Sequence, residues 1–97
     1  MRRILKFPME IGNNIVKTAD KPRWLHCDWQ DQHLVAWCEA TPYVDDPTGK
    51  TIPWFFQTML IVLLTGQSPP ENGEYVGTVM TADGLPFVVH VYAIPSG

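Results

Sequence analysis

Short apolar stretches separated by turn-forming residues run through most of the chain, and the pattern is clearest in its last third. Residues 59–64 are apolar throughout, and the run stops at the polar, proline-containing residues 65–70. Such a run predicts a buried strand that leads into a rigid loop. Beyond it, residues 74–81 and 85–94 flank the pair Asp83-Gly84, which tolerates the positive φ angles of a tight hairpin turn. These residues predict three strands, of which the last two are paired.

The N-terminal residues predict two shorter strands. Residues 3–7 form an apolar-rich stretch that ends at Pro8, and a proline usually interrupts strand pairing. Residues 11–14 are typical of a turn. Residues 15–18 then predict a short second strand.

The next segment predicts a hairpin. Residues 23–30 and 34–40 are rich in aromatic and aliphatic side chains, and polar residues separate them. A two-residue turn at Gln32-His33 would place Cys27 directly opposite Cys38. Because we expect a cytosolic protein, we predict free thiols and a fold that does not depend on a disulfide.

The middle of the chain predicts a loop and then a strand. Residues 42–53 contain the turn-forming Asp46-Pro47-Thr48-Gly49 and have no apolar period. In residues 54–64 the apolar positions are too continuous for an amphipathic helix and no capping residue precedes them, so a strand is favoured over a helix. The prediction is a single all-β domain over residues 1–97, an antiparallel sheet or sandwich of six to seven strands with little or no helix.

The charge of the chain is unevenly spread. The 97 residues carry a formal net charge of −3, yet six of the seven basic residues lie within residues 1–24. This balance does not suit binding to duplex nucleic acid, whose phosphates are bound by many cations at once. A few basic residues can still bind a small anion. The apolar residues 54–64 are far fewer than the roughly 20 that a membrane span needs, and no apolar signal segment follows Met1. We therefore expect a cytoplasmic protein that contacts neither duplex nucleic acid nor membrane.

Neither a metal centre nor a catalytic centre is predicted. His26 and Cys27 are neighbours on a predicted strand and point to opposite faces, and the cysteines and histidines lack the paired spacing of a zinc site. A nucleophile elbow, a phosphate-binding glycine loop and a carboxylate pair are also absent from the sequence. We expect no metal, no cofactor and no enzymatic activity. A cysteine or serine nucleophile with a distant histidine stays open, because such a pair has no local signature.

Five short motifs stand in order along the chain. They are Lys6-Phe7-Pro8-Met9, Leu34-Val35-Ala36-Trp37, Thr65-Gly66 before Pro69, Tyr75-Val76-Gly77-Thr78 and Phe87-Val88-Val89-His90-Val91-Tyr92. Together they resemble a family of small phage-encoded proteins of formerly unknown function, whose signature reads Gly-Thr-Gly-His-Pro, Tyr-Ile/Val-Gly-Thr and Phe-Val-Trp/Phe-His-Val-Phe/Tyr. The likeness covers residues 6–92. This chain departs from it at Leu64, in place of the first glycine, and at Gln67-Ser68, in place of the histidine.

The resemblance implies a binding protein. Such proteins are similar to the phage sponges that sequester cyclic nucleotide signals of bacterial anti-phage defence, the anti-CBASS sponges, in the host cytoplasm. A cyclic dinucleotide offers two base faces and two phosphates, so its receptor needs aromatic plates together with cations or backbone N–H groups. A pocket shared between subunits suits such a ligand, and a small domain also gains stability from association. A homo-oligomer, a dimer or a tetramer, is therefore expected.

The expected ligand-binding residues fall into three groups. They are the loop Thr65, Gly66, Gln67 and Ser68 for phosphate, the bases Lys6 and Arg23, and the aromatic residues Tyr75 and Trp24 for stacking on a nucleobase. Each group also has an ordinary structural explanation, as a strand-ending loop, solvated charges and core aromatic residues.

Other interpretations stay open. His90 alternates with valines on a predicted strand, and a hydrogen-bonded structural histidine is favoured there over a ligand contact. As a different class of function, the protein could inhibit a host protein directly through an aromatic surface. A structural role as a virion accessory domain is the third alternative.

Overall fold

Seven β-strands make up the part of the protein that the computed structural model describes, which is residues 1–43, 55–80 and 88–96. They are β1 (Arg3–Met9), β2 (Gly12–Thr18), β3 (Arg23–Gln30), β4 (His33–Ala40), β5 (Phe56–Leu64), β6 (Glu74–Met80) and β7 (Val88–Pro95). These described residues contain no helix. The all-β class predicted from the sequence is confirmed, including the strand over residues 56–64, for which a helix was the alternative.

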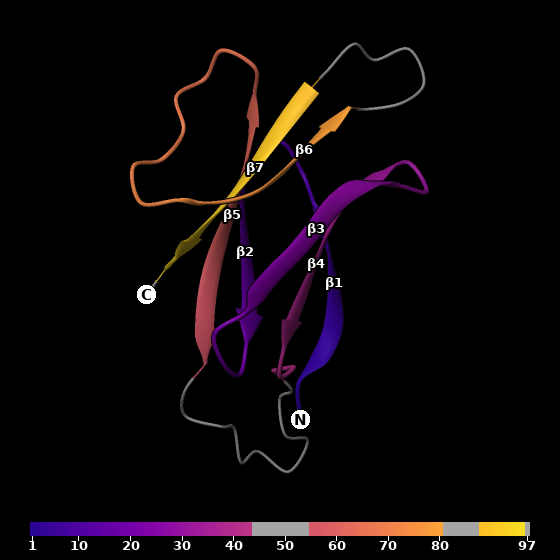
Figure 1. The fold of residues 1–97 in the computed structure, drawn as a ribbon, viewed down its shortest axis with the longest axis vertical. Helices are drawn as coiled ribbons and strands as arrows, with labels where there is room; N and C mark the ends of the chain where they lie inside the picture. The colour runs from indigo at the N-terminus through magenta and orange to yellow at the C-terminus, as the bar shows by residue number, and fades with distance from the viewer. Residues whose placement is uncertain (44–54, 81–87, 97) are drawn as a thin grey trace.

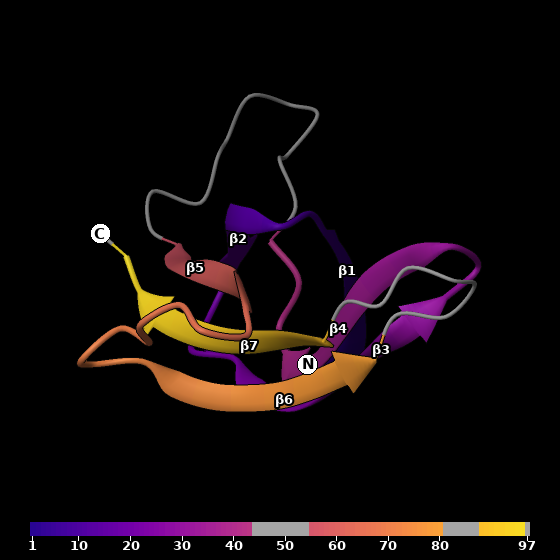
Figure 2. The same cartoon turned by 90° about the horizontal axis from the view of Figure 1, so that it is seen from above.

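The strands form two antiparallel sheets that face each other. The three-stranded sheet has the order β1-β4-β3 and the four-stranded sheet the order β2-β5-β7-β6. Figures 1 and 2 show the two sheets around a common interior, with the edge strands β3 and β6 neighbouring each other. The consecutive strands β1 and β2 belong to different sheets, so the chain changes layer at Glu10 and Ile11.

The core lies between the inner faces of these sheets. Successive side chains of a strand point to opposite faces, and in β5 and β7 every second residue is fully or almost fully buried. The inward side chains are nearly all apolar, mostly valine, leucine and alanine. The core residues are Met9, Val16, Cys27, Leu34, Ala36, Leu60, Val62, Val79, Val89, Val91 and Ala93. Burial of each valine or leucine side chain contributes about 1.5–3 kcal/mol, so this alternation is what fixes the register of the central strands.

The edge strands β3 and β6 pack against each other unusually closely at one point. A β carbon built on Gly77 would lie 2.7 Å from the Sγ of Cys27, so only glycine fits there without displacement. Both strands also have a bulge near this contact, between Trp24 and His26 in β3 and between Tyr75 and Gly77 in β6. Bulges increase the local twist, which bends these two edges around the core.

Two of the predicted boundaries near the N-terminus were wrong. Pro8 does not end the first strand, which continues to Met9. Because β1 is an edge strand that pairs only with β4, it tolerates a residue without a backbone N–H. The predicted turn at residues 11–14 belongs largely to β2, which begins at Gly12. Gly12 has a φ of 107° at the corner, and the Asn14 side chain hydrogen-bonds both the N and the O of Glu10, at 2.9 and 2.8 Å.

The turn of the β3–β4 hairpin lies one residue earlier than predicted. Asp31 and Gln32 occupy it, with positive φ values of 50° and 66°, the conformation that a two-residue hairpin loop needs. Cys27 therefore pairs with Ala36, and beyond the bulge in β3 Cys38 pairs with Trp24. The predicted Cys27–Cys38 opposition was wrong. Both cysteines are buried free thiols.

The remaining predicted elements agree with the observed strands to within a few residues where they can be compared. The prediction of residues 74–81 corresponds to β6 and that of residues 85–94 to β7. The predicted Asp83-Gly84 turn, and all but the first residues of the predicted loop at residues 42–53, lie outside the described residues.

Candidate functional site

Four polar side chains form a hydrogen-bonded chain on the outer face of the four-stranded sheet. His90 of β7 lies between two threonine hydroxyls, with Thr65 Oγ1 3.0 Å from its Nε2 and Thr78 Oγ1 3.1 Å from its Nδ1. The hydroxyl of Tyr75 is hydrogen-bonded to that of Thr78. We call Thr65, His90, Thr78 and Tyr75 the hydroxyl–histidine chain. It connects the loop after β5 to β6 by way of β7.

One set of donors and acceptors satisfies every member of this chain. Thr65 Oγ1 also lies 3.4 Å from the carbonyl oxygen of Val88, to which only the hydroxyl can donate. Thr65 then accepts from Nε2–H of His90, and the Nδ1 of His90 accepts from Thr78. Thr78 in turn accepts from Tyr75. In a neutral imidazole the two nitrogens have opposite roles, so the tautomer of His90 couples the orientation of the loop hydroxyl to that of the tyrosine hydroxyl.

A pocket of about 210 Å³ opens beside this chain. It is lined by Leu63, Gly66, Gln67, Pro69, His90 and Tyr92, and we call it the loop pocket. Gln67 holds the loop in place, since its backbone N donates to Leu64 O at 3.1 Å and its side-chain Oε1 accepts from Leu64 N at 2.7 Å. Gly66 supplies the φ of 101° that the turn requires. The loop that forms the polar wall of the pocket is therefore held in its conformation by hydrogen bonds within the chain.

An aromatic pair stands next to the loop pocket. The rings of Tyr75 and Tyr92 are 5.5 Å apart at an interplanar angle of 62°, an edge-to-face contact. Tyr92 is half-buried and lines the pocket, whereas Tyr75 is 56% exposed. Because its hydroxyl is hydrogen-bonded to Thr78 and its ring contacts that of Tyr92, Tyr75 offers an aromatic surface in a fixed position to the solvent.

The predicted loop residues and Tyr75 come together at this place. Thr65 and Tyr75 are the two ends of the hydroxyl–histidine chain, while Gly66 and Gln67 line the loop pocket. Ser68 is exposed on the same loop. Five of the eight predicted binding residues thus lie in one region, although the loop and β6 are separated along the chain.

The predicted bases lie on the other sheet. Lys6 is on β1, and its Nζ donates to Gln30 Oε1 at 3.0 Å, while Arg23 is on β3 in register with Glu39. None of the described residues that line the loop pocket is a lysine or an arginine. An anion in that pocket would be held by amide N–H groups of the loop rather than by these cations.

Three residues of the site were missing from the predicted set. Thr78, His90 and Tyr92 join the loop to Tyr75 or line the pocket. All three belong to the motifs Tyr75-Val76-Gly77-Thr78 and Phe87-Val88-Val89-His90-Val91-Tyr92, so the sequence contained a signal for them. His90 is hydrogen-bonded through both ring nitrogens, as a structural histidine would be, and it also faces the pocket.

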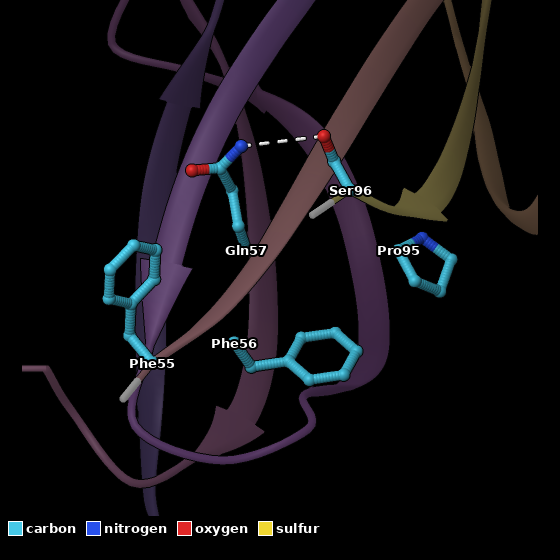
Figure 3. A pocket seen from close by; sticks show the side chains of 5 residues that line it. All are labelled: Phe55, Phe56, Gln57, Pro95 and Ser96. Atoms are coloured by element: carbon cyan, nitrogen blue, oxygen red, sulfur yellow. Dashed lines mark hydrogen bonds between the residues drawn. The ribbon is translucent and has the colours of Figure 1, made fainter. Parts of the chain in front are cut away.

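Two further pockets lie at the opposite end of the sandwich, where β5 begins and β7 ends. The larger, of about 360 Å³, is lined by Phe55, Phe56, Gln57, Pro95 and Ser96. Figure 3 shows the ring of Phe56 directed toward Pro95 and the Gln57 amide hydrogen-bonded to Ser96 Oγ, at 3.4 Å. The smaller, of about 220 Å³, shares Phe56 and Pro95 with it. The predicted residue Trp24 lines this smaller pocket, which we call the Trp24 pocket.

The described residues contain neither a metal-binding cluster nor a membrane-spanning helix. No group of three or more histidine, cysteine, aspartate or glutamate side chains in residues 1–43, 55–80 and 88–96 is arranged to hold a metal ion. In the same part of the chain, no helix has the length and apolar character needed to cross a membrane.

The fold and the site define a small antiparallel β-sandwich with a preformed polar pocket on one outer face. Comparison with known families gives the particular assignment: the chain belongs to the DUF7352 family, a domain of unknown function whose family model matches residues 1–96. Searches of the curated proteins and of the solved structures gave no match.

Proposed function

We propose that the protein is a non-catalytic binding protein that sequesters a small nucleotide at the loop pocket. The ligand class that we propose is the cyclic nucleotides that serve as signals in bacterial anti-phage defence, bound in the host cytoplasm. The observation that carries the proposal is the hydroxyl–histidine chain, because it links a polar loop to an exposed, oriented tyrosine. A nucleotide needs these two kinds of contact side by side.

The groups around the loop pocket match the parts of such a ligand. The exposed face of Tyr75 suits stacking on a nucleobase, which is worth about 1–3 kcal/mol per base. Gly66 and the side-chain amide of Gln67 offer N–H groups for phosphate oxygens, and the Thr65 oxygen can accept from a ribose hydroxyl. His90 holds the loop and Tyr75 in place, because each of its ring nitrogens is hydrogen-bonded to a threonine hydroxyl. These contacts are suited to recognition, and no bond in the ligand has to break.

The size of the pocket favours a site shared by two copies of the protein. Pockets for drug-sized ligands have volumes of roughly 300–1,000 Å³, and the loop pocket has about 210 Å³. This volume is small for a whole cyclic dinucleotide, which consists of two nucleotide halves. A two-fold dimer would present two loop pockets to the two halves of one ligand.

A second candidate function is direct inhibition of a host protein. The outer face of the four-stranded sheet carries many apolar side chains, including Ile15 and Met80, which are 50% and 77% exposed. Met59, Ile61 and Ile94 lie on the same face by register and are half-buried. Exposed apolar surface of this kind is typical of protein–protein contacts. A partner protein covering this face is the alternative to a second copy.

A ligand screen tests the proposal. A nucleotide that binds only the folded protein raises its melting temperature by mass action, so a panel of cyclic di- and trinucleotides is compared with linear mononucleotides. The affinity for the best ligand is then measured by calorimetry for Tyr75→Ala, Tyr75→Phe, Thr65→Val and Gln67→Ala. Loss of stacking or of a charge-assisted contact weakens binding by roughly tenfold to a hundredfold. Chromatography of the recovered ligand should show it unchanged.

Matched variants on the other sheet provide the control. Lys6→Ala and Arg23→Ala remove positive charge far from the loop pocket, and both should bind with the parent affinity. Tyr75→Phe keeps the ring and removes the bond to Thr78, so its affinity should lie between those of the parent and Tyr75→Ala. If no nucleotide binds the parent protein, the proposal fails and the host-protein inhibitor becomes the better explanation.

A further inference from the structure

A threonine hydroxyl is buried without a partner at the end of the sandwich opposite the loop pocket. Thr58 of β5 is 2% exposed, and its Oγ1 has no hydrogen-bond partner among the described residues. It is the only such buried side-chain atom found in that part of the chain. Other polar side chains nearby are satisfied; Thr18 Oγ1, for example, donates to Asp20 O at 2.6 Å. A buried hydroxyl that makes no hydrogen bond costs stability.

Nothing in the packing of β5 requires a hydroxyl at this position. Leu60 and Val62, the next residues on the same inner face, are apolar and buried. Valine has nearly the shape of threonine and a high strand propensity, so valine would fill position 58 without leaving a polar atom unpaired. The threonine is therefore better explained by a group that enters from outside the chain.

The Trp24 pocket is where such a group would enter. Thr58 lines it together with Trp24, Phe56, Lys21, Asn72 and Glu74. Two aromatic rings, a carboxylate, an ammonium group and an amide are thus gathered around about 220 Å³, and the Thr58 side chain forms part of the wall. Trp24 is half-buried and its ring also contacts that of Phe7, at 6.2 Å between centroids. The indole is therefore held by the core while it also lines the pocket.

This pocket is separate from the loop pocket. Thr58 lies six residues before Leu64 on the same strand, which corresponds to roughly 20 Å. The two positions also face different ways, since Thr58 is on the inner face with Leu60 and the loop pocket is on the outer face with Leu63 and His90. A ligand in one pocket of a chain does not occupy the other.

We propose that the Trp24 pocket binds a planar heteroaromatic ring with N–H groups on its edge, of the purine nucleobase or nucleoside class. The ring face would lie against the indole of Trp24, as bases do on aromatic side chains. The Glu74 carboxylate would accept hydrogen bonds from the ring edge, whereas the Thr58 hydroxyl and the Asn72 amide can both donate and accept. A purely aliphatic ligand would leave these polar groups unpaired. The charges of Lys21 and Glu74 are opposite, so the lining favours an uncharged ligand. The proposal does not depend on the loop pocket or on the function proposed for it.

The test is a titration of the full chain with guanosine, adenosine and cytidine, followed by ¹H–¹⁵N correlation spectra. The purine nucleosides should shift the indole N–H signal of Trp24 and the amide signals around Thr58, and cytidine should shift them less. Thr58→Val is the decisive variant because it removes only the hydroxyl. It should melt at the parent temperature or above, yet bind guanosine roughly fivefold more weakly, which is the effect of one hydrogen bond. Glu74→Gln should weaken guanosine binding further than it weakens adenosine binding, since guanine presents two adjacent N–H donors to a carboxylate.

Variants at the other site separate this inference from the proposed function. Thr65→Val and Tyr75→Phe should leave guanosine affinity unchanged, while Thr58→Val should leave affinity for a nucleotide at the loop pocket unchanged. The inference is overturned if purine nucleosides at millimolar concentration shift no signal of Trp24 or Thr58. It is equally overturned if Thr58→Val binds guanosine as the parent does, because the unpartnered hydroxyl then serves no ligand.

Discussion

The sulfur of Cys27 occupies the space in which a side chain on Gly77 would have to begin. The ideal β-carbon position of Gly77 lies 2.7 Å from Cys27 Sγ, closer than non-bonded atoms of this kind normally approach. Cys27 is 2% exposed and belongs to the core, where close packing leaves the sulfur little room to move. This contact joins the facing edges of the two sheets, β3 and β6.

Gly77→Ala should therefore destabilise the protein. The added methyl group overpacks the contact with Cys27, which typically costs about 1–3 kcal/mol. Urea denaturation of the parent, Gly77→Ala, Cys27→Ala and the double variant measures the coupling between the two positions. In the Cys27→Ala background the glycine substitution should cost less. An equal cost in both backgrounds would show that the sulfur is not the obstacle.

Both cysteines should be unreactive in the folded protein. Burial, with a smaller contribution from the charge of Asp28, raises the pKa of Cys27 to about 11, and burial also raises the pKa of Cys38 to about 11. At pH 8 only about one thiol in a thousand would then be the reactive thiolate. Ellman's reagent should label the native protein slowly and label both thiols at once in denaturant. Because Cys27 pairs with Ala36 and not with Cys38, added reductant should leave the melting temperature unchanged. A thiol that reacts quickly in the native protein would contradict this.

Asp20 should make the stability depend on acidic pH. The backbone N of Thr41 donates to Asp20 at 2.8 Å and the Thr41 hydroxyl at 2.7 Å, and Arg2 Nη1 lies 3.1 Å away. The Thr41 backbone bond first, then its hydroxyl and Arg2, lower the pKa of Asp20 below its ordinary value of 3.8. A folded-state pKa below the unfolded one stabilises the protein above pH 4, and this stabilisation is lost as the pH falls through the folded-state value.

The comparison of Asp20→Asn with the parent checks this dependence. The variant should melt at a lower temperature at pH 7, and the difference between the two proteins should shrink as the pH falls below about 4. Glu71→Gln, a change at an exposed acid in the loop before β6, is the matched control and should show no such convergence. A constant difference at all pH values would mean that the charge of Asp20 is not responsible.

The outer face of the four-stranded sheet should join two copies in solution. Ile15, Ile61 and Ile94 lie on this face with Met80, and water contact with so much apolar surface is unfavourable. We expect a dimer or tetramer by light scattering at micromolar concentration. Ile15→Arg should shift the mass toward the monomer. Ile4→Arg is the control, since Ile4 is 61% exposed on the other sheet, and it should keep the parent mass. A monomeric parent protein would contradict the expectation.

The strands were predictable because local patterns determine them. The apolar run in β5 and the alternation in β7 are set by burial, so the sequence indicates them directly. The turn at Asp31-Gln32 was misplaced by one residue because glutamine is a weak signal for a positive φ. That single shift changed the partner of Cys27, since the pairs between a hairpin turn and the first bulge follow from the turn.

The assembly of the site was only partly predictable. Thr65 and Tyr75 come together because both flank β7, and β7 itself lies in a motif that the sequence displays. Lys6 lies elsewhere because β1 joins β4 rather than β2, a choice between sheets that no local pattern encodes. Thr58 could not be singled out, because a threonine in an apolar strand looks the same whether its hydroxyl is paired or not.

The outermost strands of the two sheets all carry features that hinder pairing with strands of other molecules. Pro8 interrupts the donors of β1, bulges distort β3 and β6, and β2 carries the exposed Lys17, whose Nζ lies 4.6 Å from the ring centre of Phe55. Prolines, bulges and lysines at such positions hinder the addition of strands from other molecules, which is the first step toward fibres. Edges of this kind allow the folded protein to reach a high concentration without polymerising.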